Sequence, residues 1–262
     1  MNRVPVRPRP KARLVRNLVI AGAALDAILV CLSVARYPRA ITAATDGALG
    51  LIGPLAILLT YAAIGWFGAP ATARRTTGAV ELRLGTAFGG LIGALFVIEM
   101  LAGYLAPLNE GQNATLGTVM YGGFALLLVM AGIAGGWQTR RVTGGGLAAA
   151  WGAVLGSLLW LAALWLTFHV FWGTPQEARQ FVVDQVIADF QRSGGTDLRA
   201  FVIQDNLGGS FFHLLLGLLL ASLLGLFGGA AGVGLARVFS RRGNDAGRNQ
   251  TQPAEGDTVT RE

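Results

Sequence analysis

Apolar residues are concentrated in six long blocks along the chain. The blocks cover residues 17–37, 47–66, 84–105, 116–137, 146–172 and 211–239. Each reaches about the twenty residues that an α-helix needs to cross roughly 30 Å of hydrocarbon. The blocks lack the two-residue alternation of strands, and a helix satisfies its backbone hydrogen bonds within one segment, as lipid requires. The pattern predicts an all-α integral membrane protein built as a six-helix transmembrane bundle.

Composition supports lipid as the solvent of this chain. Hydrophobic residues make up 53% of the 262 positions and charged residues 13%, about half the usual share of a soluble domain. The expected organisation is a basic cytoplasmic N-tail (1–16), transmembrane helices 1–5 (17–172), an outer insertion (173–208), transmembrane helix 6 (209–240) and a C-tail (241–262). The C-tail is rich in polar residues and is expected to be disordered and cytoplasmic.

The positive charge is placed for membrane insertion and not for nucleic acid. The net charge is +7, and six basic residues precede position 17 without an acid or an aromatic residue between them. A transmembrane block follows directly, which is typical of a segment that faces anionic lipid. Asp26 interrupts this first block and further blocks follow, so we expect an uncleaved helix and not a signal peptide.

Basic residues also predict the orientation. The N-tail, the segments around Arg75 and Arg141, and the C-terminal segment from Arg237 together hold sixteen of the twenty-one Lys and Arg residues. By the positive-inside rule, both termini are expected in the cytoplasm. The strong preference for Arg over Lys and the lack of eukaryotic sorting signals favour a bacterial cytoplasmic (inner) membrane.

The helices could form three tandem hairpins of one orientation. The second helix of each expected pair leads through glycine into an Arg-Arg pair, at Arg74-Arg75, Arg140-Arg141 and Arg241-Arg242. Selection for positive charge inside, acting on a glycine-rich chain, produces the same resemblance without any repeat. The sequence leaves both explanations open.

The outer insertion carries helix signals. Thr174-Pro175-Gln176-Glu177 has the form of a capping box with proline at the first helical position. Five apolar residues then share one face of a predicted helix that Gly194-Gly195 ends, and Asp197 is placed to cap a second short helix over residues 198–204. The shared apolar face consists of Val182, Val183, Val186, Ile187 and Phe190. We expect these amphipathic helices to cap the bundle, with adsorption to the outer lipid surface as the alternative.

Glycine is about twice as frequent as usual, with 38 residues. It recurs every fourth residue within three blocks, at Gly85, Gly89 and Gly93, at Gly152 and Gly156, and at Gly225 and Gly229. This spacing lets helix backbones approach closely in lipid, so helix packing is the expected role. The alternative is that these glycines line a transport path or permit sliding. No phosphate-binding loop motif is present.

Four ionisable residues at membrane depth are the candidate polar sites. Asp26 and Glu99 lie within blocks one and three, and His169 and His213 lie near the outer ends of blocks five and six. An intramembrane acid is costly and suggests function, although interhelical hydrogen bonding to hydroxyls, amides or histidine is the alternative. We expect the two histidines to form hydrogen bonds, because two are too few for a metal site.

These features support two hypotheses for function. No cofactor is expected, the single cysteine Cys31 excludes an intramolecular disulfide, and no HExxH or GxSxG motif is present, so an enzyme is not predicted. The first hypothesis is a structural, assembly or regulatory membrane component that contacts lipid and other membrane proteins or its own copies. The second is a small permease or ion- or proton-linked transporter that uses Asp26 and Glu99.

Overall fold

The computed structural model describes residues 10–42 and 49–250 and confirms the all-α six-helix prediction. Its elements are α1 (Pro10–Arg36), α2 (Arg39–Thr42), α3 (Leu49–Ala63), a π-helix (Ile64–Gly68), α4 (Ala69–Ala73), α5 (Gly78–Leu105), α6 (Glu110–Thr139), α7 (Val142–Val170), α8 (Pro175–Val183), α9 (Val186–Ser193) and α10 (Leu198–Gln250). Six of the described helical stretches are long and apolar enough to cross a membrane. The expected tails at 1–9 and 251–262 lie outside the described residues.

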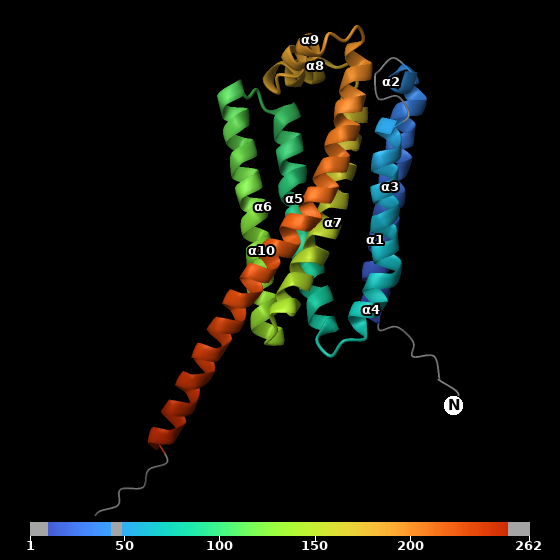
Figure 1. The fold of residues 1–262 in the computed structure, drawn as a ribbon. Helices are drawn as coiled ribbons and strands as arrows, with labels where there is room; N and C mark the ends of the chain where they lie inside the picture. Colours follow the sequence, from blue (N-terminus) through green and yellow to red (C-terminus); the bar gives the residue numbers. More distant parts are fainter. Residues whose placement is uncertain (1–9, 43–48, 251–262) are drawn as a thin grey trace, which may run out of the picture.

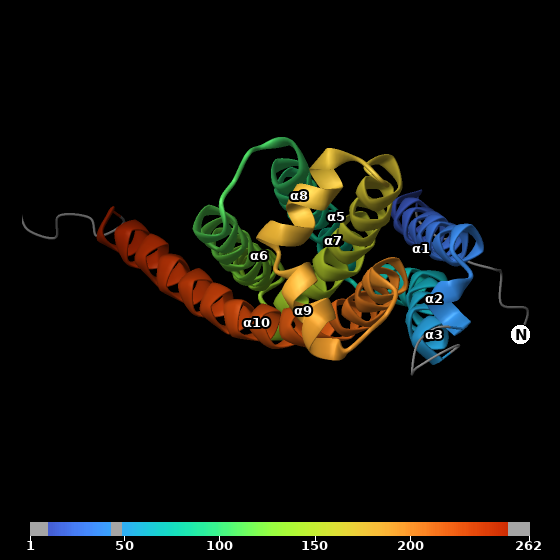
Figure 2. The same ribbon diagram turned by 90° about the horizontal axis from the view of Figure 1, so that it is seen from above.

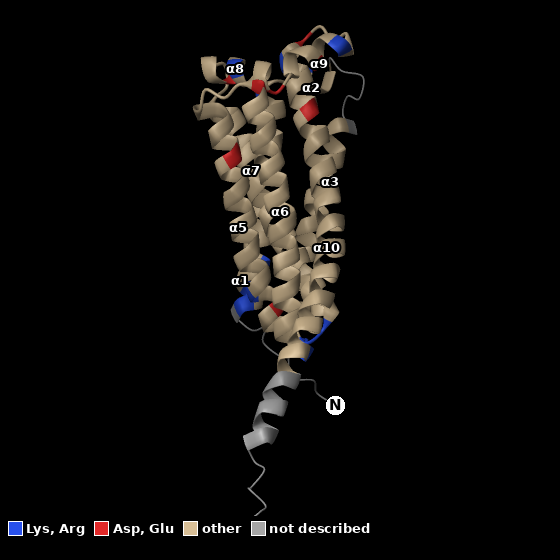
Figure 3. Cartoon of the chain, turned by 90° about the vertical axis from the view of Figure 1, so that its left-hand side faces the viewer, with Lys and Arg blue, Asp and Glu red and all other residues tan. Residues whose placement is uncertain are grey.

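The six spans stand side by side and alternate in direction (Figure 1). The start of α1 and the α4–α5 and α6–α7 turns lie at one end, whereas α2, α8 and α9 lie at the other. We call these the inner and the outer end. Charged residues gather at the two ends, and the middle of the bundle is nearly free of them (Figure 3). This distribution matches a hydrocarbon layer around the middle of the bundle. The chain is therefore a multi-pass membrane protein.

Helix α7 is the central element of the bundle. In an apolar stretch of 18 residues of α7, 72% of the residues are buried, against 17–39% in the corresponding stretches of the other five spans. It packs against α1, α5, α6 and α10, which surround it when the bundle is viewed from above (Figure 2). The other spans turn large apolar side chains outward, including Leu59 and Phe227. The four surrounding spans therefore owe much of their position to α7, whereas α3 packs against α1 and α10.

Glycines bring α5 and α7 into close contact. A Cβ atom on Gly89 would lie 3.0 Å from the carbonyl oxygen of Gly152 and 2.8 Å from the Cβ of Leu155. Gly85 and Gly93 face α7 one turn to either side, and Gly156 faces Ile92 of α5. Larger residues on this seam would separate the helices, and lipid supplies no hydrophobic drive to bring them together.

A second glycine seam seats α10 against α6 and α7 near the inner end. Gly225 and Gly229 face α7, where a Cβ on Gly229 would lie 2.5 Å from the carbonyl oxygen of Val142. On the other side, a Cβ on Gly132 of α6 would lie 2.5 Å from the carbonyl oxygen of Gly225. Gly145 of α7 lies at the same crossing. Three helices therefore meet here with almost no side chain between them.

The outer insertion differs from the predicted single helix with one apolar face. Gln185 adopts a left-handed conformation (φ 60°) and separates α8 from α9. Gln185 and the preceding Asp184 instead hydrogen-bond to the start of α6, at Glu110 and at Asn113. As a result, the predicted face is wrong in α8, where Phe181 is buried and Val182 is 66% exposed.

The expected short helix at 198–204 is not separate, because α10 runs without a break from Leu198 into the last transmembrane span. Asp197 does cap its start, with its carboxylate accepting a hydrogen bond from the Ala200 amide at 3.0 Å. At the other end, α10 continues to Gln250. The helix is continuous because α10 has no interior proline to break it.

We predict that Gly132→Ala lowers the stability of the detergent-solubilised protein. The new methyl group would contact the α10 backbone, and overpacking of this kind costs about 1–3 kcal/mol. The thermal midpoint should then fall by several degrees. Gly122→Ala on the same helix is the control, since no atom lies within 4 Å of its Cβ position. Equal melting of the two variants would show that the α6–α10 crossing tolerates separation.

Candidate functional site

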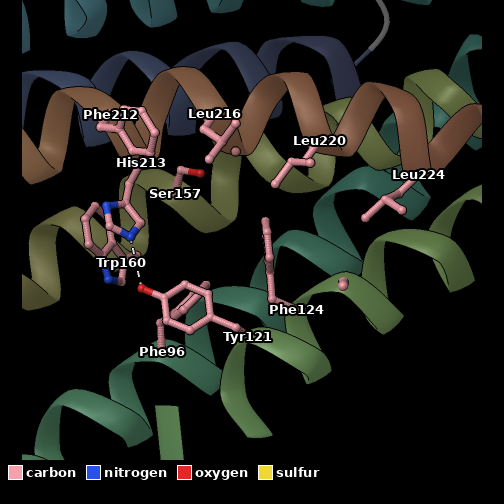
Figure 4. Close-up of a pocket in the computed structure, with 12 residues that line it drawn as sticks. Phe96, Tyr121, Phe124, Ser157, Trp160, Phe212, His213, Leu216, Leu220 and Leu224 are labelled. Atoms are coloured by element: carbon pink, nitrogen blue, oxygen red, sulfur yellow. Dashed lines mark hydrogen bonds between the residues drawn. The ribbon is translucent and has the colours of Figure 1, made fainter. Parts of the chain in front are cut away.

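An aromatic cavity of about 250 Å³ with a few polar groups lies between α5, α6, α7 and α10. It includes one of the four predicted sites, His213. Figure 4 shows the side chains from these four helices converging on the cavity. Its lining consists of Phe96, Tyr121, Phe124, Ala125, Ser157, Trp160, Phe212, His213, Leu216, Gly217, Leu220 and Leu224.

His213 places two hydrogen bonds at the polar end of this cavity. Its Nδ1 lies 2.8 Å from the carbonyl oxygen of Gly209, one turn back along α10. A carbonyl can only accept, so Nδ1 carries the proton. In the neutral ring, Nε2 is then an acceptor, and the Tyr121 hydroxyl, 2.9 Å away, donates to it. Both ring nitrogens are therefore used, and the Tyr121 oxygen keeps its lone pairs free to accept.

Aromatic rings hold the His213–Tyr121 pair in place. The His213 ring lies over Trp160 of α7, with centroids 4.8 Å apart. Phe96 of α5 contacts Tyr121 edge-on at 5.9 Å and Trp160 at 6.4 Å. Trp160 and Phe96 are both buried. These contacts restrict the pair to one arrangement at a wall shared by four helices.

Glu99 lies one turn outward from Phe96, near the same cavity. It is half-buried, and a Cβ on Gly117 of α6 would lie 3.7 Å from its Oε1. Gly117 is in turn one helical turn from Tyr121. The carboxylate has no hydrogen-bond partner within the described part of the chain. Glu99 therefore places an unpaired acid at the outer edge of the cavity.

Asp26 lies on the opposite side of α7, within the α1–α7 interface. Two neighbours on its helix face fix this position: Gly22 faces Leu158 of α7, and Ser33 hydrogen-bonds to His169 of α7 at 3.1 Å. Asp26 lies between them on the same face of α1. Its side chain is fully buried, and neither carboxylate oxygen has a partner among the described residues. The expected hydrogen bonds to hydroxyls or His169 are therefore not present.

Two more unpaired polar atoms lie in this interface on α7. They are the indole nitrogen of Trp165 and Nδ1 of His169. His169 does bond to Ser33 through Nε2, as expected of a structural histidine. Buried polar atoms without partners are uncommon in proteins. The α1–α7 interface is therefore a second polar region, but α7 separates it from the cavity with Glu99 and His213.

Sequence analysis missed a buried ion pair at the outer end. The two terminal nitrogens of Arg199 donate to the two carboxylate oxygens of Glu177 at 2.5 and 2.8 Å. The Glu177 side chain is only 2% exposed, and the Arg199 guanidinium also lies 4.3 Å from the Trp172 ring centroid. The capping signal gave Glu177 a purely local role. The ion pair joins α8 to the start of α10, and no local sequence pattern predicts this contact.

A second buried acid, Glu81, was also missed. It lies in the first turn of α5 near the inner end, where an acid is common and gives no signal of burial. It is fully buried and accepts a hydrogen bond from Thr77 at 2.7 Å. Arg75 approaches its other oxygen at 3.9 Å. This set closes the α4–α5 turn and is structural.

The chemistry of these groups is hydrogen bonding and packing. Among the side chains that the structure describes, in residues 11–42 and 50–240, no three His, Cys, Asp or Glu are grouped so that they could hold a metal ion. His213 has no acid behind it to act as a catalytic relay, since its Nδ1 is bound to a backbone carbonyl. The arrangement is suited to binding an uncharged polar group within an apolar environment.

We predict that Arg199→Met destabilises the protein strongly, because it leaves the Glu177 carboxylate buried without its partner. Breaking a buried pair from one side typically costs about 3–5 kcal/mol. The thermal midpoint in detergent should fall, and adding Glu177→Gln should restore part of the loss. Arg192→Met is the matched control, since its pairing with Asp189 is exposed. A similar small effect of Arg192→Met and Arg199→Met would contradict the assignment.

Comparisons of the chain with protein-family models, with curated proteins and with solved structures found no match. No relative therefore transfers a site residue, an activity or a partner to this chain. The functional argument depends on the placement of these residues alone.

Proposed function

We propose that this chain is a non-catalytic component of a bacterial cytoplasmic membrane, of the structural, assembly or regulatory kind. In this proposal the inner end, with Arg74, Arg75, Arg140 and Arg141, faces the cytoplasm, as do both termini. The outer end carries α8 and α9. The protein contacts the lipid bilayer and other membrane proteins or its own copies, and it does not bind nucleic acid.

The continuity of α10 is the observation that carries this proposal. Its first turn contains Arg199, which pairs with Glu177 in the outer cap formed by α8 and α9. His213, about four turns further along, lies in the cavity. Near the inner end, Arg140 of α6 donates to the Ala236 carbonyl at 2.7 Å and to Ser240 at 2.9 Å. The stretch Leu198–Ser240 has 43 residues, or about 65 Å of helix. Such a helix can transmit a displacement of the outer cap to the cytoplasmic side.

The separation of the two candidate acids supports a non-transport role. Asp26 lies between α1 and α7, whereas Glu99 lies between α5 and α6. The central helix α7 stands between them and is closely packed along the α5 and α10 glycine seams. Two acids on opposite sides of a packed helix do not line one path.

The transporter remains the second candidate function, and one observation favours it. Asp26 is fully buried with both carboxylate oxygens unpartnered. An acid at membrane depth with no structural bond is the type of residue that proton-linked transporters use.

We predict the topology first. Reporter fusions after Arg75 and Arg141 should report a cytoplasmic location, and fusions near Asn113 and Gly194 should report the outside. The reason is the excess of basic residues in the inner segments. A fusion after Arg242 should also report a cytoplasmic location. An outside signal at Arg141 would contradict the proposed orientation.

We further predict that the Asp26→Asn and Glu99→Gln variants keep the abundance and melting temperature of the wild type. Each variant should also complement a chromosomal deletion as well as the wild type does. The amides keep the shape and polarity of the side chains but cannot exchange a proton with water. Proteoliposomes containing the wild-type chain should pass protons no faster than empty liposomes when a potassium diffusion potential and a pH dye are applied.

The double variant Asp26→Asn/Glu99→Gln is the matched control in the same liposomes. Proton flux by the wild-type chain that this folded variant loses would replace the proposed function with the transporter. Failure of a stable, abundant amide variant to complement the deletion would do the same.

A further inference from the structure

We propose that the cavity between α5, α6, α7 and α10 is a binding site for a neutral lipid with a hydroxyl headgroup, of the diacylglycerol type. The hydroxyl donates to the Tyr121 oxygen, and an acyl chain lies along α10. This ligand site is additional to the structural, assembly or regulatory role proposed above.

The cavity opens sideways toward the surrounding lipid. Its rim is formed by exposed residues of α6 and α10, with Tyr121 47% and Phe212 59% exposed, whereas its floor is formed by buried Phe96 and Trp160. The helices α6 and α10 meet at the inner glycine seam and diverge toward the outer end (Figure 1). A ligand can therefore enter between α6 and α10 from within the membrane, without crossing water.

The apolar part of the site follows α10 toward the bilayer centre. Phe212, Leu216, Leu220 and Leu224 line the cavity at four-residue spacing (Figure 4). Residues four apart share one face of a helix, so the stripe extends about 18 Å along the axis. Phe124 of α6 faces it across the cavity. This is an elongated apolar groove with its polar groups at one end, which fits a lipid chain better than a compact solute.

Hydrogen-bond polarity specifies the headgroup. His213 uses Nδ1 on the Gly209 carbonyl and Nε2 on the Tyr121 hydroxyl, so the ring offers nothing further. The Tyr121 proton is directed to His213, which leaves its oxygen as an acceptor at the cavity. The Ser157 hydroxyl lies in the opposite wall. The complementary ligand group is a hydrogen-bond donor, which a neutral alcohol supplies.

Charge excludes the common phospholipids as the preferred ligand. Neither Lys nor Arg lines the cavity, and the acid Glu99 lies one turn outward from Phe96. A phosphate placed there would meet no cation and a neighbouring carboxylate. A neutral alcohol avoids this repulsion.

The test uses the full chain in phosphatidylcholine nanodiscs with a diacylglycerol that carries a diazirine on one acyl chain. After photolysis, we expect labels on the α6 and α10 peptides that contain Tyr121 and Leu216. Unlabelled diacylglycerol should compete, and phosphatidylglycerol should not.

Three variants locate the binding. Tyr121→Phe keeps the ring but removes the acceptor, so diacylglycerol should compete about five- to tenfold more weakly. Gly217→Leu should abolish the labelling, because its side chain would project toward Ser157, 3.4 Å from the Cβ position, and fill the cavity. Gly122→Leu on the open face of α6 should bind as the wild type does.

The melting temperature of each variant, compared with that of the wild type, distinguishes loss of the binding site from loss of the fold. Labels spread evenly over all lipid-facing helices would show ordinary solvation by lipid and overturn the proposal. Competition by phosphatidylglycerol equal to that by diacylglycerol, or unchanged competition in Tyr121→Phe, would overturn the assignment of a hydroxyl headgroup.

Discussion

Close approach of helix backbones at glycine is the interaction on which the rest of this structure depends. Lipid tails are as apolar as leucine, so burial from water does not hold membrane helices together. Here α5 approaches α7 at Gly89 and Gly152, and α10 approaches α6 and α7 at Gly132, Gly225 and Gly229. Many short-range contacts then act together, each small in energy. The central position of α7 follows, because both seams use it.

The cavity arises where this close packing ends. At the inner crossing, glycines leave no space between α6 and α10, but toward the outer end the same helices carry Tyr121, Phe212 and Leu216. The large side chains hold the axes of α6 and α10 apart toward the outer end, whereas the glycines let the two helices meet at the inner crossing. The opening is therefore a geometric consequence of the glycine seam, and the His213–Tyr121 bond gives it a polar end.

The outer cap stabilises the open end of the bundle. Arg199 lies between the carboxylate of Glu177 and the ring of Trp172, and Tyr37 donates to Asp197 at 2.8 Å. Both contacts involve the start of α10, so α8, α1 and α10 are joined where the spans are furthest apart. The cap and the inner seam thereby fix the two ends of one continuous helix.

The sequence by itself determined the helical class, the six spans and the glycine spacing, because solvent and backbone geometry impose these locally on each segment. It also identified Thr174 and Asp197 as helix caps. Only the tertiary structure decided which acids are partnered. Asp26 is buried with no hydrogen bond among the described residues, while Glu177, which the sequence marked only as a capping residue, pairs with Arg199. Such pairings depend on which helix faces lie opposite each other, and the pattern of hydropathy along the chain does not determine which faces meet.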